Sequence, residues 1–293
     1  TFALERARGI TIFSKQAVFP LGDTFVTLLD TPGHVDFSAE MERTLQVLDY
    51  AILVISGADG VQGHTETLWK LLTRYGIPVF LFVNKMDQEG TDCGKLLAEL
   101  KSRFSEGCID FGRVETGAEE VIEEIAVCDE QTMEEYLEKG SVAAASIRRL
   151  VAERKIFPCY FGSALKMEGV EKLIHGLDRY TRCPVYPEAF GAKVYKIARD
   201  DQGNRLSYMK ITGGTLKVKE LLITSKGNVA AGEDVWEEKA DQIRIYSGAR
   251  FELVKEVPAG TVCAVTGLSH TFPGQGLGVT ENSNMPVLEP VLN

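Results

Sequence analysis

The feature that most constrains this chain is an apolar run that ends in a sharp polar turn. Residues 25–29 are followed at once by the pentapeptide Asp-Thr-Pro-Gly-His at 30–34, and a helical pattern runs from 38 to 48. A short apolar run bounded by turn residues predicts a buried strand. The proline and glycine force the chain out of that strand sharply. The stretch therefore predicts a strand–turn–helix unit.

The polar groups of this turn suit a phosphate and a cation. A carboxylate at a strand end, such as Asp30, is a common place for Mg²⁺. The backbone N–H of Gly33 is free to meet a phosphate, and His34 sits beside the point where that phosphate would be attacked. Thr11, a hydroxyl between two isoleucines, is a further candidate ligand. An ordinary turn with a solvated aspartate, and a threonine that merely favours a strand, is the alternative.

Two later apolar runs, 77–83 and 157–161, also end in polar loops. The first continues into Asn-Lys-Met-Asp at 84–87, and the second into Gly-Ser-Ala-Leu at 162–165. Ligands of parallel α/β sheets bind outside the carboxyl ends of the strands. We therefore expect these loops and the 30–34 turn to form one binding site.

The loop at 84–87 has a chemical reason to select guanine. Asp87 can accept hydrogen bonds from both N1–H and the exocyclic amine of guanine, and adenine has no matching pair of donors. Asn84 can bond the base edge and neighbouring loops, and the aliphatic stem of Lys85 can cover the base. The alternative is a polar loop after a buried strand.

The loop at 162–165 supplies backbone donors. Ser163 and Ala164 would offer N–H groups to the guanine carbonyl, and Leu165 completes the loop. This loop is followed by the helical pattern of 169–180, the last of the α/β region.

The alternation of strand and helix patterns predicts an α/β domain with a mostly parallel sheet. From residue 190 onward, short β-rich runs separated by Gly- and Pro-containing turns predict a small antiparallel barrel. We expect a nucleotide-binding domain over 1–187 with an acidic insertion at about 105–138, a barrel over 188–280, and the start of a following domain at 281–293.

The net charge of −10 is unevenly distributed. Residues 105–138 hold twelve acids and one base, which leaves the rest of the chain at +1. An argument against nucleic-acid binding from the global charge is therefore unsafe, and the acidic run is interpreted as a solvated helical face. No apolar run is long enough to span a bilayer. The six cysteines lack zinc or C-x-x-C spacing, which predicts free thiols in a reducing cytoplasm.

Basic residues of the barrel gather at two predicted turns. Lys210, Lys217 and Lys219 surround the Gly-Gly turn at 213–214, and Arg244 and Arg250 flank the Ser-Gly turn at 247–248. We expect them at the surface, where bases on the turns of a rigid barrel suit shape-based contact with RNA phosphates; solvated side chains are the alternative.

Four motifs, in this order and strand context, resemble those of a translational GTPase of the elongation factor G type. They are Arg-Gly-Ile-Thr-Ile at 8–12, the 30–34 turn, the 84–87 loop and Gly-Ser-Ala at 162–164. The barrel is similar to the second domain of that family. Within the family, the chain looks closest to the tetracycline-resistance ribosomal protection proteins. The reasons are the extension at 88–92 and a segment between the last two motifs that is shorter than elongation factor G carries.

The resemblance implies the cofactors GTP or GDP and Mg²⁺, and a role for each residue. Thr11 and Asp30 would hold Mg²⁺, the Gly33 amide would contact the γ-phosphate, and His34 would position the attacking water. The 84–87 and 162–165 loops would read guanine as described above. The family's partner is the ribosome, which implies a cytoplasmic, monomeric GTPase whose barrel contacts small-subunit rRNA.

The chain departs from the family pattern because its 293 residues contain no G-x-x-x-x-G-K-[ST] phosphate loop. In the family this loop and its strand precede the first switch, the segment that contains the 8–12 motif. We therefore expect them upstream of Thr1, with three further domains after the barrel. Without the loop the chain as it stands is expected to be inactive. The alternatives are an elongation factor G-like translocation factor and a non-hydrolysing ribosome-binding fragment or paralogue.

Overall fold

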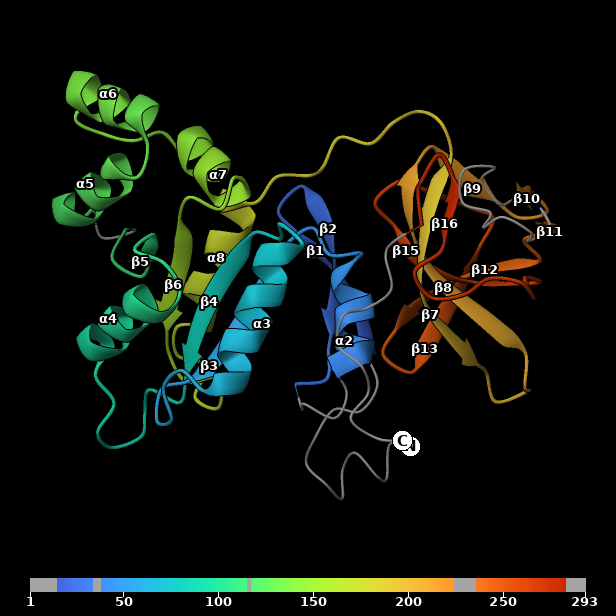
Figure 1. Ribbon diagram of the computed structural model, residues 1–293, viewed down its shortest axis with the longest axis horizontal. Coiled ribbons are helices and arrows are strands. Elements are labelled where there is room, and N and C mark those ends of the chain that lie inside the picture. Colours follow the sequence, from blue (N-terminus) through green and yellow to red (C-terminus); the bar gives the residue numbers. More distant parts are fainter. Residues whose placement is uncertain (1–14, 34–37, 115–116, 224–235, 283–293) are drawn as a thin grey trace. The chain divides into compact units, whose positions relative to one another are not determined.

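The computed structural model describes residues 15–33, 38–114, 117–223 and 236–282. The described residues divide into two compact units, whose elements Figure 1 labels. One unit runs from Leu48 to Cys183, and the other joins the residues before Leu48 to those from Pro184 onward. The described residues before Leu48 thus group with the barrel, although the sequence places them in a domain over 1–187. That domain boundary stays a prediction.

The unit from Leu48 to Cys183 is built on a parallel sheet with the strand order β3-β4-β6-β5. The strands are β3 (Ala51–Ser56), β4 (Val79–Asn84), β6 (Phe157–Phe161) and β5 (Cys108–Asp110). In β4, every side chain from 79 to 83 is at most 4% exposed. A strand covered on both faces is typical of a parallel sheet flanked by helices. The predicted α/β class is confirmed.

Helices pack around this sheet (Figure 1). They are α3 (Gly63–Arg74), α4 (Cys93–Arg103), α5 (Glu119–Val127), α7 (Ala144–Ala152) and α8 (Val170–Tyr180), whereas α6 (Glu130–Lys139) packs on α5, further from the sheet. One apolar cluster joins β4, β5 and β6 to α5, α7 and α8. The ring of Trp69 in α3 stacks on Phe104, with 4.6 Å between centroids, and meets Phe157 of β6 edge-on at 4.7 Å. The parallel pairing of β4 with β6, in which Val83 lies opposite Phe161, places the carboxyl ends of the two strands side by side.

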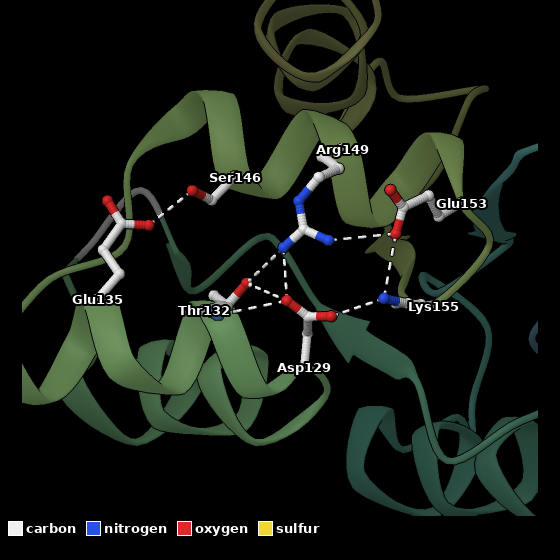
Figure 2. Close-up of polar contacts among 7 residues, drawn as sticks. All are labelled: Asp129, Thr132, Glu135, Ser146, Arg149, Glu153 and Lys155. Carbon is white, nitrogen blue, oxygen red and sulfur yellow. Dashed lines mark hydrogen bonds and ion pairs between the residues drawn. The ribbon is translucent and has the colours of Figure 1, made fainter.

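The acidic segment forms the helices α5 and α6, which pack against each other. Among the described residues of 105–138, seven carboxylates are exposed, as expected of a solvated face: Glu106, Glu119, Glu120, Glu123, Glu130, Glu134 and Glu138. Asp129 differs because its side chain is only 10% exposed and binds Arg149 and Lys155 (Figure 2). Glu135 is also mostly buried, with 15% of its side chain exposed, and accepts from the Ser146 hydroxyl. The segment therefore combines a solvated face with carboxylates that are bound within the fold.

Residues 15–30 form an antiparallel hairpin of β1 (Lys15–Leu21) and β2 (Thr24–Asp30). The chain reverses at Gly22, whose φ of 55° suits glycine. The predicted strand at 25–29 is present, but its predicted burial is wrong, because Phe25 is 80% exposed and Leu28 43%. Among the described residues β2 pairs only with β1 and is not part of the parallel sheet. The tight turn brings β1 beside β2, and closing such a short loop costs little entropy. The apolar pattern of a strand does not say what will cover its apolar face.

Helix α2 (Ser38–Leu45) follows the 30–34 turn and is shorter than the predicted helix over 38–48. Met41 and Leu45 are 3% and 6% exposed. Glu40 forms an ion pair with Lys196 of β7 (Gly191–Arg199), with 3.6 Å between Oε1 and Nζ. Helix α2 is therefore attached to the barrel strands of its own unit.

The barrel region consists of antiparallel strands, as predicted. A six-stranded sheet has the order β13-β12-β15-β8-β7-β16, and two short pairs, β10-β11 and β14-β9, accompany it. The further strands are β8 (Arg205–Gly213), β9 (Thr215–Lys217), β10 (Leu221–Ile223), β11 (Glu237–Lys239), β12 (Gln242–Ser247), β13 (Arg250–Val254), β14 (Glu256–Pro258), β15 (Val262–Thr266) and β16 (Gly276–Gly278). Their inward residues, such as Met209, Ile243 and Val265, form one core with 0% exposure.

Two further findings concern the helices and the cysteines of the described ranges. None of the helices in the described ranges is long and apolar enough to cross a membrane. All six cysteines lie in described ranges and none forms a disulfide, as the sequence predicts.

Candidate functional site

The loop after β4 begins at Asn84, whose side chain organises both base-reading loops. Its Oδ1 accepts hydrogen bonds from the backbone N–H of Lys85 and of Ala164, both at 2.8 Å. Lys85 has a φ of 63°, a left-handed conformation that costs a non-glycine residue energy. Such strain persists only where neighbouring contacts impose it, and here they direct the chain from β4 toward Asp87.

The loop after β6 is fixed to the first loop through the backbone. The N–H of Gly162 donates to the Val83 carbonyl at 2.9 Å, and the N–H of Met86 donates to the Gly162 carbonyl at 3.0 Å. Ser163 and Glu168 exchange two backbone hydrogen bonds of 3.0 Å and close the second loop on itself. A Cβ on Gly162 would lie 2.1 Å from the Glu168 carbonyl oxygen, so the closed loop requires glycine.

Asp87 lies where these two loops meet. Its side chain is 20% exposed, and its Oδ2 is 3.6 Å from Nζ of Lys166. A hydrogen bond from the hydroxyl of Ser163 is the main reason that the pKa of Asp87 is lowered, and the charge of Lys166 adds to it. An ionised carboxylate only accepts hydrogen bonds, so it fits the two donors of guanine.

The backbone donors of the second loop are already used within the chain. The N–H of Ser163 donates to Glu168, and the N–H of Ala164 donates to Asn84. A base carbonyl that approached them would share or replace these bonds. Leu165 is 91% exposed beside them, in a position to cover an apolar ring face.

Two residues to which the sequence assigned no role, Thr91 and Lys166, complete this site together with Gly162 of the predicted 162–165 loop. The hydroxyl of Thr91 donates to the Met86 and Gln88 carbonyls, both at 2.9 Å, and closes the end of the first loop. Lys166 carries the charge nearest to Asp87. Gly162 allows the close backbone contact. The extension at 88–92 pointed towards Thr91, but no spacing rule links 166 to 87.

The predicted phosphate and cation residues are described only in part. Asp30 is exposed at the end of β2, opposite Lys15. Gly33 is exposed, and a Cβ added there would meet no atom within 4 Å, so its backbone is open to a ligand. Thr11 and His34 lie outside the described residues. Asp30 and Gly33 belong to one compact unit and the base-reading loops to the other.

The described residues meet some of the requirements of a nucleotide and its cation. The carboxylate of Asp87 and the exposed Leu165 fit a guanine base. In the described part of the chain, no three His, Cys, Asp or Glu side chains gather as a metal site. A Mg²⁺ ion bound by few protein ligands, with the remainder from phosphates and water, is usual at nucleotide sites.

A family model described as the elongation factor Tu GTP binding domain matches residues 1–182, more than half of the chain. The chain belongs to this family of translational GTPases. Its relatives include elongation factor G of Ureaplasma parvum serovar 3, 28% identical over 93% of this chain and 48% of that protein. The oxytetracycline resistance protein of Streptomyces rimosus is 31% identical over 94% of this chain and 45% of that protein.

This translational GTPase chain thus spans about half the length of the curated relatives it matches. A crystal structure of a protein from Thermus thermophilus is similar, with a TM-score of 0.80 and 23% identity. The similarity covers 97% of this chain and 49% of that one, and it supports the fold alone. The resemblance to elongation factor G and to tetracycline-resistance proteins is confirmed by the two curated relatives.

Proposed function

We propose that this translational GTPase binds and hydrolyses GTP, acts on the ribosome, and protects it against tetracycline. The observation that supports guanine binding is the Asp87 carboxylate, which has a lowered pKa and lies between two hydrogen-bonded loops at the ends of β4 and β6. The relative named for oxytetracycline resistance supports the specific task. Such a factor would work as a monomer in the cytoplasm, where ribosomes are.

The proposed hydrolysis assigns the 30–34 turn to the phosphates. Asp30 and Thr11 would hold Mg²⁺, which neutralises phosphate charge when bound. The Gly33 N–H would donate to the γ-phosphate, and His34 would orient the attacking water. In the intact protein, His34→Ala is expected to cut GTP turnover by roughly 10²-fold, as for a residue that positions a nucleophile, and to leave GDP affinity unchanged.

Nucleotide selectivity tests the first part of the proposal. Calorimetry on the intact protein should show binding of GTP and GDP and no measurable binding of ATP. Asp87→Asn is expected to weaken GTP and to favour xanthosine nucleotides, whose donors and acceptors match an amide. Equal affinity for GTP and ATP would contradict guanine recognition.

Two observations favour different tasks on the ribosome, so a second candidate is kept. The relative named elongation factor G supports translocation as the alternative, and the relative named for oxytetracycline resistance supports protection. Expression of the intact protein in a tetracycline-sensitive bacterium separates the two. Protection predicts growth on tetracycline that is lost with Asp87→Asn, whereas translocation predicts rescue of a strain depleted of elongation factor G.

The 293-residue chain as it stands contains no phosphate-loop motif, so we propose that it binds GTP weakly or not at all by itself. The backbone cradle and lysine of that motif supply the charge-assisted contacts to the phosphates. Micromolar GTP binding by this chain in calorimetry would contradict the proposal. If the intact protein also binds GTP weakly or not at all, a non-hydrolysing, ribosome-binding protein is the third candidate.

A further inference from the structure

The backbone of Lys166 is held in place by Ser163, which also binds Asp87. Its backbone N–H donates to the Ser163 carbonyl at 3.2 Å and lies 3.4 Å from the Ser163 Oγ. The Ser163 side chain is 1% exposed and its hydroxyl is hydrogen-bonded to the Asp87 carboxylate. Beyond Lys166, Met167 adopts a φ of 60° and turns the chain back to Glu168. The loop therefore fixes where the lysine starts relative to the carboxylate.

The distance between the two charged groups defines what Lys166 can do. At 3.6 Å, Nζ and Oδ2 form an ion pair that is longer than a good hydrogen bond. The ammonium group thus attracts the carboxylate without filling one of its acceptor positions. A carboxylate offers about four lone-pair sites, and guanine needs two of them.

The exposure of the two side chains adds a second argument. Asp87 is 20% exposed and Lys166 is 53% exposed. A base that settles on Asp87 removes water from the carboxylate, and a charge that loses water needs a partner or hydrogen bonds. Because 53% of its side chain is exposed, Lys166 can keep much of its own hydration.

We propose that Lys166 is a positioning residue for guanine recognition, whose ammonium group orients the Asp87 carboxylate and balances its charge when a base covers it. This inference rests on the proposed function. It assigns to Lys166 an action through Asp87 and no direct contact with the base.

The test is a double-mutant cycle on the intact protein, with affinities measured by calorimetry at low salt. Lys166→Gln is expected to weaken GDP binding roughly two- to five-fold, the range of a partly exposed ion pair. Lys166→Arg, which keeps the charge, should restore most of that loss. In an Asp87→Asn background, measured with xanthosine diphosphate, Lys166→Gln should have no effect, because no carboxylate remains.

A matched control and added salt complete the experiment. Lys172 of α8 is an exposed lysine of the same unit that donates to the Gly112 carbonyl at 3.5 Å, and Lys172→Gln should leave GDP affinity unchanged. The loss caused by Lys166→Gln should shrink at high salt because the pair is partly exposed.

The outcomes separate this inference from the proposed function. The role of Lys166 would be overturned if Lys166→Gln weakened nucleotide binding equally in the wild-type and Asp87→Asn proteins, or did not weaken it in the wild type. Guanine selectivity would stand in either case. Failure of the wild-type protein to prefer GDP over ADP would overturn the proposed function, and the inference with it.

Discussion

Asp129 connects helices α6 and α7 and the loop that precedes β6 through one carboxylate. It caps the start of α6 by accepting the N–H of Thr132 at 3.2 Å, and it binds Arg149 of α7 and Lys155, each at 2.5 Å (Figure 2). The hydrogen bonds from Arg149 and Lys155 hold its pKa far below the usual range. A carboxylate whose folded pKa is lowered stabilises the fold above its unfolded pKa, and that contribution is lost as the pH falls.

Replacing Asp129 should therefore cost more than the loss of a helix cap. Asp129→Ala is expected to lower the free energy of unfolding by about 2–4 kcal/mol, from a lost cap and two lost bonds to charged donors. Asp92, which caps α4 by accepting only the Lys95 N–H, is the matched control. Asp92→Ala should cost about 1 kcal/mol. Equal losses in urea denaturation would show that the ion pairs add nothing.

Asp200 has a related arrangement in the barrel. Its carboxylate accepts the side-chain amide of Asn204 at 3.0 Å and Nη1 of Arg244 at 3.0 Å. The hydrogen bonds of Asn204, with those of Arg244, lower its pKa to about 2. Arg244 is 7% exposed and also lies over the Phe251 ring, so the prediction that it faces RNA is wrong.

The pH dependence of barrel stability follows from the sign of that shift. Because the folded pKa lies below the unfolded value near 4, Asp200 stabilises the barrel above pH 4, and this contribution disappears between pH 4 and 2. Asp200→Asn should therefore flatten the fall in melting temperature over this window. If the melting temperatures of wild type and variant differed by the same amount from pH 6 to pH 2, the lowered pKa of Asp200 would be contradicted.

At the scale of elements, short loops decide where functional groups lie. The loop from Gly162 to Gly169 has its own backbone pairing at Ser163 and Glu168, and it is bonded to the loop after β4. The two loops are thus joined to each other as well as to the ends of their strands. A change in one loop should reach the other, which gives a structural test.

Gly162→Ala is expected to destabilise the protein by roughly 1–3 kcal/mol and to weaken guanine binding, because its Cβ would force the Glu168 backbone away. Gly63→Ala is the control, since a Cβ at this first residue of α3 meets no atom within 4 Å. That change should be neutral or stabilising by up to about 1 kcal/mol. Thermal unfolding and calorimetry of both variants would check the difference.

One side chain that the sequence suggested for RNA, Lys210, instead binds the segment just after helix α2. Nζ of Lys210 donates to the Val47 carbonyl at 3.1 Å, just beyond the end of α2, and Lys210 is 5% exposed. A cation at a helix C-terminus is favourable because of the helix dipole. The expectation that Lys210 lies on the surface is therefore wrong, because packing of α2 against the strands buries it.

At the scale of the whole molecule, charge is separated along the chain. The acidic run lies in the unit from Leu48 to Cys183, whereas residues 191–293 hold twelve bases and twelve acids. Of the five bases predicted to contact RNA, Lys217, Lys219 and Arg250 remain exposed. Lys217 pairs with Glu256 at 3.7 Å and Lys219 with Asp241 at 2.9 Å, both in exposed pairs that are weak. A phosphate could replace either acid.

If the barrel contacts rRNA of the small subunit, ribosome affinity should fall with added salt. Replacing Lys217 and Lys219 together by Glu in the intact protein should weaken ribosome binding and flatten the salt dependence. The control exchanges two exposed lysines of the other unit, Lys70 and Lys95, for Glu, which changes the net charge equally. Equal effects of the two pairs would indicate a general charge effect instead of a contact at this turn.

The sequence by itself determined the local elements and the chemistry of the base-reading loops. Hydrophobic periodicity and turn residues predicted β4, β6 and the antiparallel barrel, because these patterns depend on neighbours in the chain. Asp87 was identified from its acceptor geometry, and the structure adds Ser163 as the group that keeps it ionised.

Only the tertiary structure decided which partner each element and side chain finds. It exposed Phe25 in a hairpin, buried Lys210 and Arg244 among the barrel residues, and brought Lys166 to Asp87 across 79 positions of sequence. The physical reason is that burial and ion pairing depend on the distance in space between residues far apart in the chain. Periodicity reports which face of an element is apolar, but not what will lie against it.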